Sequence, residues 1–221
     1  MMKMVLSSRV FIARVIVGFF LLITCGMTYG TESDISCLKS VKASLEDPYN
    51  YLQSWNFEHK AEGFICKFTG VECWNLLENR VLNLKLSNMG LKGHFPRGIR
   101  NCSSLTGLDL SNNRLSKTIP EDISTLLTFV TSLDLSSNDF TGAIPVSLAN
   151  CSYLNTIKLD QNKLTGQIPE ELTQLQRLKS FSVSNNFLTG RIPTFRCGVA
   201  SADSYANNSG LCGAPLDPCR A

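Results

Sequence analysis

The sequence is poor in histidine and contains no pattern of side chains from which a catalytic or metal site could be built. Its two histidines, His59 and His94, are isolated, and no nucleophile has a base at a recognisable spacing. An enzyme reaction needs such a constellation, and a structural zinc needs ligands at short, regular spacings. We therefore expect no enzyme activity, no metal and no cofactor.

An excess of one charge is also absent once the amino-terminal segment 1–30 is set aside. The chain has 21 basic and 18 acidic residues, and Lys3, Arg9 and Arg14 account for the difference. A near-neutral protein has no general attraction to nucleic acids or anionic membranes, so neither is expected as a partner. No run of 18 apolar residues follows residue 30, so we expect no membrane span after that point.

The amino-terminal segment 1–30 has the features of a secretory signal peptide. A basic start precedes the short apolar stretch "VIVGFFLLITC", and the small residues Thr28 and Gly30 are spaced for cleavage. An uncleaved membrane anchor is the alternative, but the apolar run is short for a spanning helix. We expect a protein in the secretory pathway that ends at the cell surface or in the apoplast.

Nine cysteines in an exported chain predict disulfides, because the secretory route is oxidising. Two pairs stand out, Cys66 with Cys73 and Cys212 with Cys219, each enclosing six residues. We predict a bond within each pair. Cys37 and Cys197 have no assigned partner on this reasoning.

One phrase recurs along the chain: "LDLSNNRLSKTIP" at 108–120 is followed by "LDLSSNDFTGAIP", "IKLDQNKLTGQIP" and "FSVSNNFLTGRIP". Aligned on one apolar position, the copies fall at a nearly constant interval, at Leu86, Leu110, Leu135, Leu159 and Val183. The pattern L-x-x-L-x-L-x-x-N-x-L-x-G-x-I-P is the leucine-rich repeat signature. It predicts an α/β repeat fold: a right-handed solenoid of five plant-type 24-residue repeats, with a concave parallel β-sheet and disulfide-locked caps at both ends.

The non-leucine positions of the repeat also have physical roles. An asparagine at the end of each strand (Asn113, Asn138, Asn162 and Asn186) is expected to satisfy backbone groups of the turn and to form a ladder. Met89 replaces the first ladder asparagine, and Lys117 replaces a glycine found in the other repeats, so we expect local distortion there.

These features divide the chain into four segments. We predict a signal peptide at 1–30, an amino-terminal cap at 31–78, repeats at 79–195 and a carboxyl-terminal cap at 196–221. The first cap should contain an amphipathic helix from about Ile35 to Leu45, the loop closed by Cys66 and Cys73, and a packed Trp55.

Two more cysteines, Cys102 and Cys151, occupy the same position two repeats apart. Strands about 4.8 Å apart would separate them by about 10 Å, which is too far for a disulfide. We interpret both as small buried apolar side chains.

The outward residues of the predicted strands are mostly small and polar, which favours a protein partner over a small-molecule substrate. Charged candidates for partner binding on this concave face are Lys85, Asp109, Asp134, Lys158 and Asp160. Three sequons, at Asn101, Asn150 and Asn207, are candidate glycan acceptors.

Nearly all of the chain after residue 30 resembles the extracellular part of plant leucine-rich repeat receptor-like kinases, above all the BIR group of pseudokinases. The resemblance is carried by "CLKSVKASLEDPYNYLQSWNF", "GFICKFTGVECWNLLENRVLNLKLSNMGLKGHFP" and "GLCGAPLDPC". It implies a plasma-membrane regulator that binds SERK-type co-receptor ectodomains and restrains immune and brassinosteroid receptor complexes. The kinase-like domain of such relatives is absent from this chain, which is either a fragment or a secreted truncation.

A secreted inhibitor of microbial wall-degrading enzymes is the alternative function. Plant proteins of that kind are similar in their repeats, but they form longer solenoids of about ten repeats with a paired-cysteine amino-terminal cap. The shorter repeat array of this chain favours the receptor ectodomain.

Overall fold

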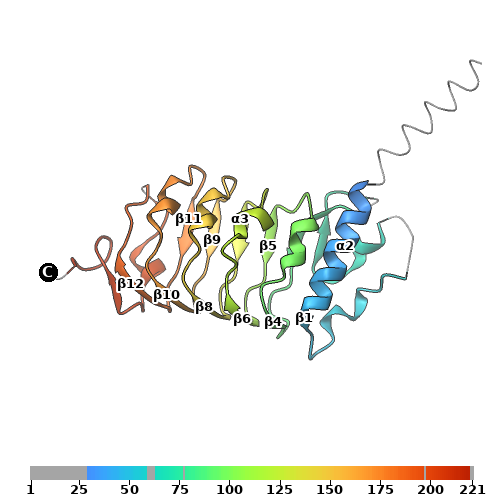
Figure 1. The fold of residues 1–221 in the computed structure, drawn as a ribbon, viewed down its shortest axis with the longest axis horizontal. Helices are drawn as coiled ribbons and strands as arrows, with labels where there is room; N and C mark the ends of the chain where they lie inside the picture. Colours follow the sequence, from blue (N-terminus) through green and yellow to red (C-terminus); the bar gives the residue numbers. More distant parts are fainter. Residues whose placement is uncertain (1–28, 59–62, 77, 197, 220–221) are drawn as a thin grey trace, which may run out of the picture.

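The structure is a computed structural model that describes residues 29–58, 63–76, 78–196 and 198–219. Successive turns of the chain stack side by side into an elongated solenoid with one cap at each end (Figure 1). The signal peptide predicted at 1–30 lies almost entirely outside the described residues, and so does Cys197.

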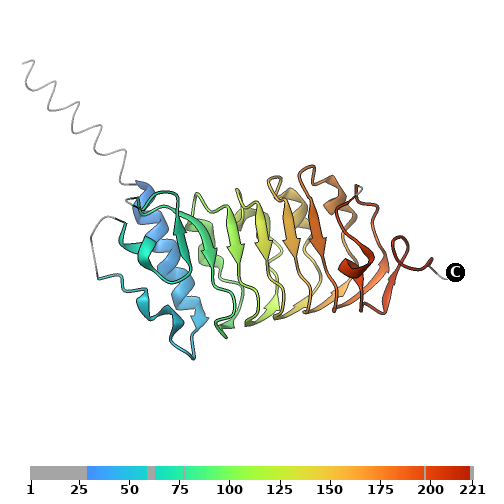
Figure 2. The ribbon, with the colours of Figure 1, turned by 180° about the vertical axis from the view of Figure 1, so that it is seen from behind.

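The concave face is a sheet of short strands, which are turned towards the viewer in Figure 2. Its strand order is β11-β9-β7-β5-β3-β2, and all neighbours are parallel except β2 and β3. The strands are β2 (Val71–Cys73), β3 (Val81–Lys85), β5 (Gly107–Asp109), β7 (Ser132–Asp134), β9 (Thr156–Lys158) and β11 (Ser180–Ser182). This is the concave parallel sheet that the repeat pattern predicts.

A second sheet runs along the lower edge of the solenoid in Figures 1 and 2. Its strand order is β1-β4-β6-β8-β10-β12-β13. The strands are β1 (Leu45–Glu46), β4 (Lys92–Gly93), β6 (Arg114–Thr118), β8 (Asp139–Gly142), β10 (Lys163–Gly166), β12 (Phe187–Arg191) and β13 (Gly210–Cys212). The repeat pattern did not predict this sheet, but the proline that follows each of its strands favours an extended or tight-turn segment over a regular helix.

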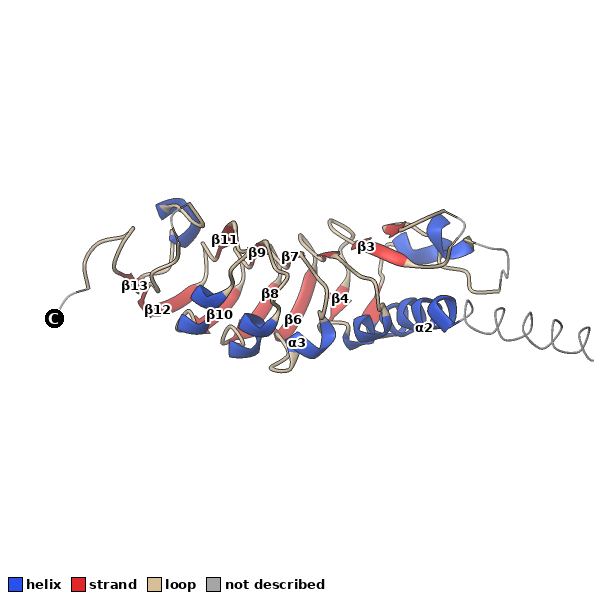
Figure 3. Cartoon of the chain, turned by 90° about the horizontal axis from the view of Figure 1, so that it is seen from above, coloured by secondary structure: helices blue, strands red, loops and turns tan. Residues whose placement is uncertain are grey.

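Short helices cover the convex side, and Figure 3 shows them opposite the concave strands. These are η3 (Arg97–Asn101), α3 (Ile123–Leu126), η4 (Val146–Asn150) and η5 (Glu170–Gln174). Each follows the Ile-Pro or Phe-Pro pair of its repeat and buries apolar side chains, such as Leu148 or Leu172. The leucines between the two sheets and these helices form one continuous core.

The ladder asparagines bind the backbone of two consecutive turns. Asn162 Nδ2 donates to the carbonyls of Leu159 and Asp160 in its own repeat and of Leu135 in the preceding one, at 3.0–3.2 Å. Its Oδ1 accepts the N–H of Phe140 at 3.0 Å. The buried amide thus satisfies four backbone groups that would otherwise lack partners.

The residue before each ladder asparagine adopts a left-handed conformation, with φ between 53° and 58° at Asn112, Ser137, Gln161, Asn185 and Asn207. Lys117, which replaces glycine in its repeat, also stays left-handed, with φ 69° compared with 78° at Gly142. The predicted distortion at Lys117 is therefore not seen in the backbone. The lysine keeps the glycine conformation instead, at a steric cost.

The amino-terminal cap is built on α2 (Tyr29–Ser44), which starts before the predicted Ile35. A disulfide between Cys37 and Cys102 joins this helix to the end of η3. The interpretation of Cys102 as a free buried thiol was therefore wrong, whereas Cys151 is free and buried. A Cβ on Gly98 of η3 would collide with the Ser40 side chain, so glycine permits the close approach of the two helices.

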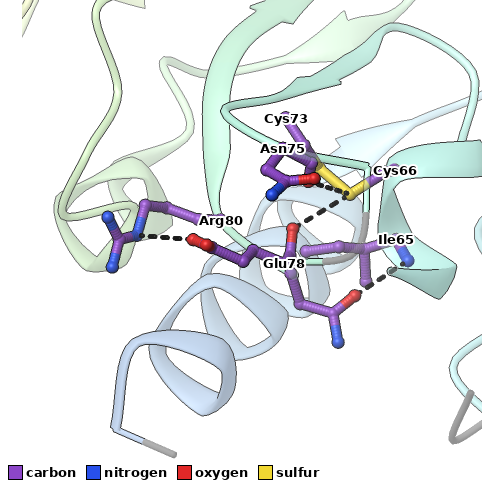
Figure 4. The surroundings of a disulfide bond; sticks show 7 residues. Ile65, Cys66, Cys73, Asn75, Glu78 and Arg80 are labelled. Atoms are coloured by element: carbon purple, nitrogen blue, oxygen red, sulfur yellow. Dashed lines mark hydrogen bonds and ion pairs between the residues drawn. A yellow bond between two sulfur atoms is a disulfide. The ribbon is translucent and has the colours of Figure 1, made fainter. Parts of the chain in front are cut away.

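The rest of this cap is a loop closed by the Cys66–Cys73 disulfide, shown in Figure 4. Two short helices of the cap, η1 (Tyr51–Ser54) and η2 (Phe64–Lys67), precede this loop, and η2 overlaps its start. Cys66 Sγ lies 3.2 Å from the Glu78 carbonyl, a close contact rather than a hydrogen bond, because a disulfide sulfur has no proton. Trp55 is buried as expected, stacks on Phe68, and donates from Nε1 to the Thr69 carbonyl at 2.9 Å.

The carboxyl-terminal cap continues the ladder by one step that the sequence pattern did not predict. Asn208 is buried, donates to the carbonyls of Val183 and Tyr205 at 3.0 Å, and accepts the Leu188 N–H. The short helix η6 (Ala202–Tyr205) takes the place of a further concave strand. The Cys212–Cys219 disulfide closes this end of the molecule.

Candidate protein-binding surface

The structure aligns four of the predicted binding residues in one row across the concave sheet. The strand register places Lys85 beside Asp109, Asp109 beside Asp134, and Asp134 beside Lys158. The fifth, Asp160, is half-buried just after β9. We call the four aligned side chains the concave row.

The charges of the concave row are largely compensated within the protein. Lys85 Nζ lies 2.6 Å from Glu72 Oε1, and Lys158 Nζ lies 3.2 Å from Asp134 Oδ2. The hydrogen bond from Lys85, with a second from Asn83, lowers the pKa of the Glu72 carboxyl. The row therefore presents paired charges, which contribute more to orientation than to affinity.

The two aspartates also stabilise the turns at the ends of their strands. Asp109 Oδ1 accepts hydrogen bonds from the N–H and the hydroxyl of Ser111, and Asp134 does the same for Ser136. Ser136 is buried, although it stands two residues after Asp134, where regular strand alternation would place both side chains on the same outward face. Any change at Asp134 consequently alters the fold as well as the surface.

A second surface, which the sequence pattern did not identify, lies beside the concave sheet. Phe129 and Tyr153 are 50% and 39% exposed, with ring centroids 5.8 Å apart. The Arg177 guanidinium lies 5.2 Å from the centre of the Tyr153 ring. We call these three residues the flank patch.

The repeat itself aligns the flank patch. Its members stand shortly before β7, β9 and β11, in the segment that joins each convex helix to its strand. Next to Phe129 is a hollow of about 160 Å³, whose lining includes Leu105, Leu126 and Val130. In the sequence, the flank patch corresponds to the middle residues of "TFV", "SYL" and "QRL". These residues fall outside the strand positions from which the binding residues were predicted.

The three candidate glycan acceptors differ in accessibility. Asn150 is exposed at the end of η4, and Asn101 is half-buried at the end of η3. Asn207 is exposed but donates from Nδ2 to Asn185 Oδ1 at 2.8 Å. Their glycosylation remains a prediction, and Asn150 is the least constrained acceptor.

Within the part of the chain that the structure describes, no group of three or more histidine, cysteine or acidic side chains is arranged to hold a metal. In the same residues, no helix has the length and apolar character needed to cross a bilayer.

Comparison with known proteins identifies both the modules and the family. Residues 31–74 match the leucine rich repeat N-terminal domain, and residues 104–126, 129–151 and 153–175 match the Leucine Rich Repeat model. The crystal structure of the BIR2 ectodomain from Arabidopsis thaliana shares 51% identity, with a TM-score of 0.82 over 84% of this chain and 98% of that one. The chain belongs to the ectodomain family of leucine-rich repeat receptor kinases.

Further relatives agree with this assignment. The crystal structure of the BIR3–SERK2 complex from the same plant contains a chain 43% identical to this one, with a TM-score of 0.79 over 85% of this chain and 100% of that chain. The inactive LRR receptor-like serine/threonine-protein kinase BIR2 of Arabidopsis thaliana is 50% identical over 198 residues. These residues are 89% of this chain and 33% of BIR2, so the chain spans about a third of that kinase and covers its leucine-rich repeat region. Such ectodomains lie outside the cell or at its surface.

Proposed function

We propose that this chain binds a SERK-type co-receptor ectodomain through the flank patch, with the concave row at the rim of the interface. We further propose that this binding restrains immune and brassinosteroid receptor complexes. The observation that carries the proposal is the exposed, aligned set of Phe129, Tyr153 and Arg177. A relative with 43% identity is named in a complex with SERK2, which supports the choice of partner.

The flank patch has the chemistry of an interface centre. Aromatic residues and arginine dominate binding energy in protein complexes because they bury large, rigid surfaces. Arg177 and Phe129 both contact Tyr153, so the patch loses little conformational freedom on binding. The hollow beside Phe129 can accept an apolar side chain of the partner.

Restraint of the receptor complexes would follow from occupation of the co-receptor ectodomain by this chain. A co-receptor whose ectodomain is bound by this chain is unavailable to a ligand-sensing receptor that needs the same surface, in proportion to concentration and affinity. In a mixture of receptor ectodomain, its ligand and SERK2 ectodomain, added chain should lower the amount of ternary complex measured by size-exclusion chromatography. An unchanged amount at saturating chain would refute the restraint while leaving the binding intact.

Binding itself is tested by calorimetry with SERK2 ectodomain. Tyr153→Ala combined with Arg177→Ala should weaken binding at least about 30-fold, or about 2 kcal/mol, because the change removes the central ring of the patch and the guanidinium that packs on it. The control is Phe187→Ala, which removes a more exposed aromatic ring, 64% compared with 39% for Tyr153, from the second sheet. A larger loss in the control than in the double variant would place the interface on that other face.

The concave row is tested by Lys158→Glu. This change breaks the ion pair with Asp134 and reverses one exposed charge, so we expect a smaller loss of affinity of about three- to tenfold, mainly in the association rate.

The alternative function, inhibition of microbial wall-degrading enzymes, is tested by adding a microbial polygalacturonase to the same assay in place of SERK2 ectodomain. Tight binding of that enzyme with no binding of SERK2 would favour the inhibitor.

A further inference from the structure

The outward side of the second sheet carries positive charge that the proposed function does not use. Lys92, Arg114 and Lys117 line one shallow depression of about 700 Å³, together with Lys163 and His94. The acidic residues in its lining are Glu46 and Asp139, and Asp139 is already paired with Lys163 at 2.5 Å. In the described part of the chain Lys92, Arg114 and Lys117 form no ion pair, and we call these three residues the basic face.

Two members of the basic face are held close together. The parallel register pairs Lys92 on β4 directly with Arg114 on β6. Neighbouring strands are about 4.8 Å apart, and like charges directly opposite each other destabilise a sheet. On the other side of Lys92 the antiparallel register places Glu46 of β1, which partly offsets this repulsion, although the described residues show no ion pair between them. Arg114 is exposed and has no such partner, so its positive charge is presented to the surface.

The third member occupies a strained position. Lys117 has φ 69°, where the corresponding residues of the next two repeats are Gly142 and Gly166 with φ 78°. A residue with a side chain is disfavoured in this conformation, and glycine would remove the strain. Other residues with side chains, such as Ser137 and Gln161, are left-handed at a fixed point of the repeat, so strain alone does not mark a site. At Lys117 it accompanies a cation that lines the depression, and this combination supports a binding role.

The lining of the depression excludes several classes of ligand. It contains no aliphatic, phenylalanine, tyrosine or tryptophan side chain, unlike the aromatic centre of a protein interface. It is open and shallow, unlike the enclosed pockets that hold small molecules. The hydroxyls of Ser116 and Thr141 lie among cations on consecutive strands, an arrangement suited to an extended polymer with both carboxylates and hydroxyls.

We propose that the basic face binds a linear polysaccharide of uronic acids. Arginine and lysine would bind its carboxylates, and the Thr141 hydroxyl would bind its sugar hydroxyls. The Ser116 hydroxyl donates to the Gly93 carbonyl at 3.2 Å, so it would act towards the sugar as an acceptor. An ectodomain outside the cell would meet such a polymer in the extracellular matrix. The inference goes beyond the proposed function and involves neither the flank patch nor the concave row.

The test measures binding of the full secreted chain to oligogalacturonate of about twelve sugar units by biolayer interferometry at several salt concentrations, since screening weakens exposed charge interactions. A triple variant removes the basic face: Lys92→Ser, Arg114→Ser and Lys117→Gly. We expect at least tenfold weaker binding by this variant. The matched control removes the same charge from other exposed positions: Lys67→Ser, Arg100→Ser and Lys179→Ser.

The control should retain binding within about twofold, because its charges lie outside the depression. Equal losses in the two triple variants, or equal binding of methyl-esterified oligogalacturonate, would overturn the proposal. Tighter binding of polyglutamate or of phosphatidylserine vesicles would also overturn it, in favour of an acidic protein or a lipid surface. The basic-face variant should bind SERK2 ectodomain as the parent does, so failure of one proposal is distinguishable from failure of the other.

Discussion

Asp34 on α2 should make the stability of the amino-terminal cap depend on pH. Its side chain is fully buried, and neither carboxylate oxygen accepts a hydrogen bond of normal geometry from the described residues. Burial raises the pKa of Asp34 to about 7, and the nearby Val81 N–H and Arg80 charge offset only part of this rise. The folded protein thus keeps this proton to a much higher pH than the unfolded chain does.

The sign and size of the effect follow from this difference. In the unfolded chain the carboxyl should titrate near its ordinary value of 3.8. Below that pH both states are protonated and the stability is unaffected. Between about pH 4 and 7 only the unfolded chain loses the proton, so stability falls by about 1.4 kcal/mol per pH unit. The loss reaches about 4 kcal/mol and stays constant above pH 7, where both states are ionised.

Asp34→Asn tests this reasoning because asparagine has the same shape and no charge. In urea unfolding with intact disulfides, the variant should be more stable than the parent by about 3–4 kcal/mol at pH 8 and within about 1 kcal/mol of it at pH 4. Hydrogen exchange of the α2 amides shows whether the gain is confined to the cap. Asp217→Asn, at an exposed position, is the control. Parallel pH profiles for the parent and Asp34→Asn would refute the assignment.

Three further changes test the repeat architecture by urea unfolding. Asn162→Ala should cost about 3 kcal/mol, because it leaves buried backbone groups such as the Phe140 N–H unpaired, and exposed Thr165→Ala should cost under about 0.5. Leu135→Ala should cost about 2–5 kcal/mol by opening a cavity in the core, and an unchanged midpoint would contradict its burial. Lys117→Gly should add about 0.5–1 kcal/mol by relieving the left-handed strain, and a loss of stability would show that the side chain supports the fold.

The periodic part of the molecule was predictable because each repeat sets its own geometry. Leu135 and Asn162 meet the same neighbours as their counterparts one turn away, so one local pattern fixes their burial and hydrogen bonds. Asn208 escaped notice because it follows Asn186 at a shorter interval than the one between the other ladder asparagines, although it makes the same contacts. Once the interval changes, sequence spacing no longer identifies the ladder.

The structure of the amino-terminal cap could not be predicted from the repeat period in this way. The Cys37–Cys102 bond joins residues 65 apart, and no repeated pattern predicts how a helix outside the array docks on the first turn. The close contact at Gly98 depends on that docking and has no sequence signature of its own. Comparing Cys102 only with its repeat counterpart Cys151 therefore led to the wrong pairing state.

The candidate surface was only partly predictable, for a related reason. Strand alternation identified the concave row, but it could not show that Lys158 and Asp134 neutralise each other or that Asp134 also supports a turn. The flank patch lies in the segments before the strands, where the alternation of side chains in a strand does not predict which residues point outward. Recognising Phe129 and Tyr153 required the turn that brings them to the surface.

The two proposed surfaces should bind independently, because they lie at opposite ends of the concave strands. Phe129 lies shortly before β7, whereas β6 and β8, which line the basic face, follow the concave strands β5 and β7 along the chain. Ligands on the two surfaces therefore need not touch, and a repeat array transmits little strain between them. In calorimetry, saturating oligogalacturonate should leave the Kd for SERK2 ectodomain within about twofold of its value alone, since a coupling free energy near zero changes neither affinity. Mutual exclusion of the two ligands would instead mean that the partner extends across the second sheet, so that the basic face belongs to the protein interface.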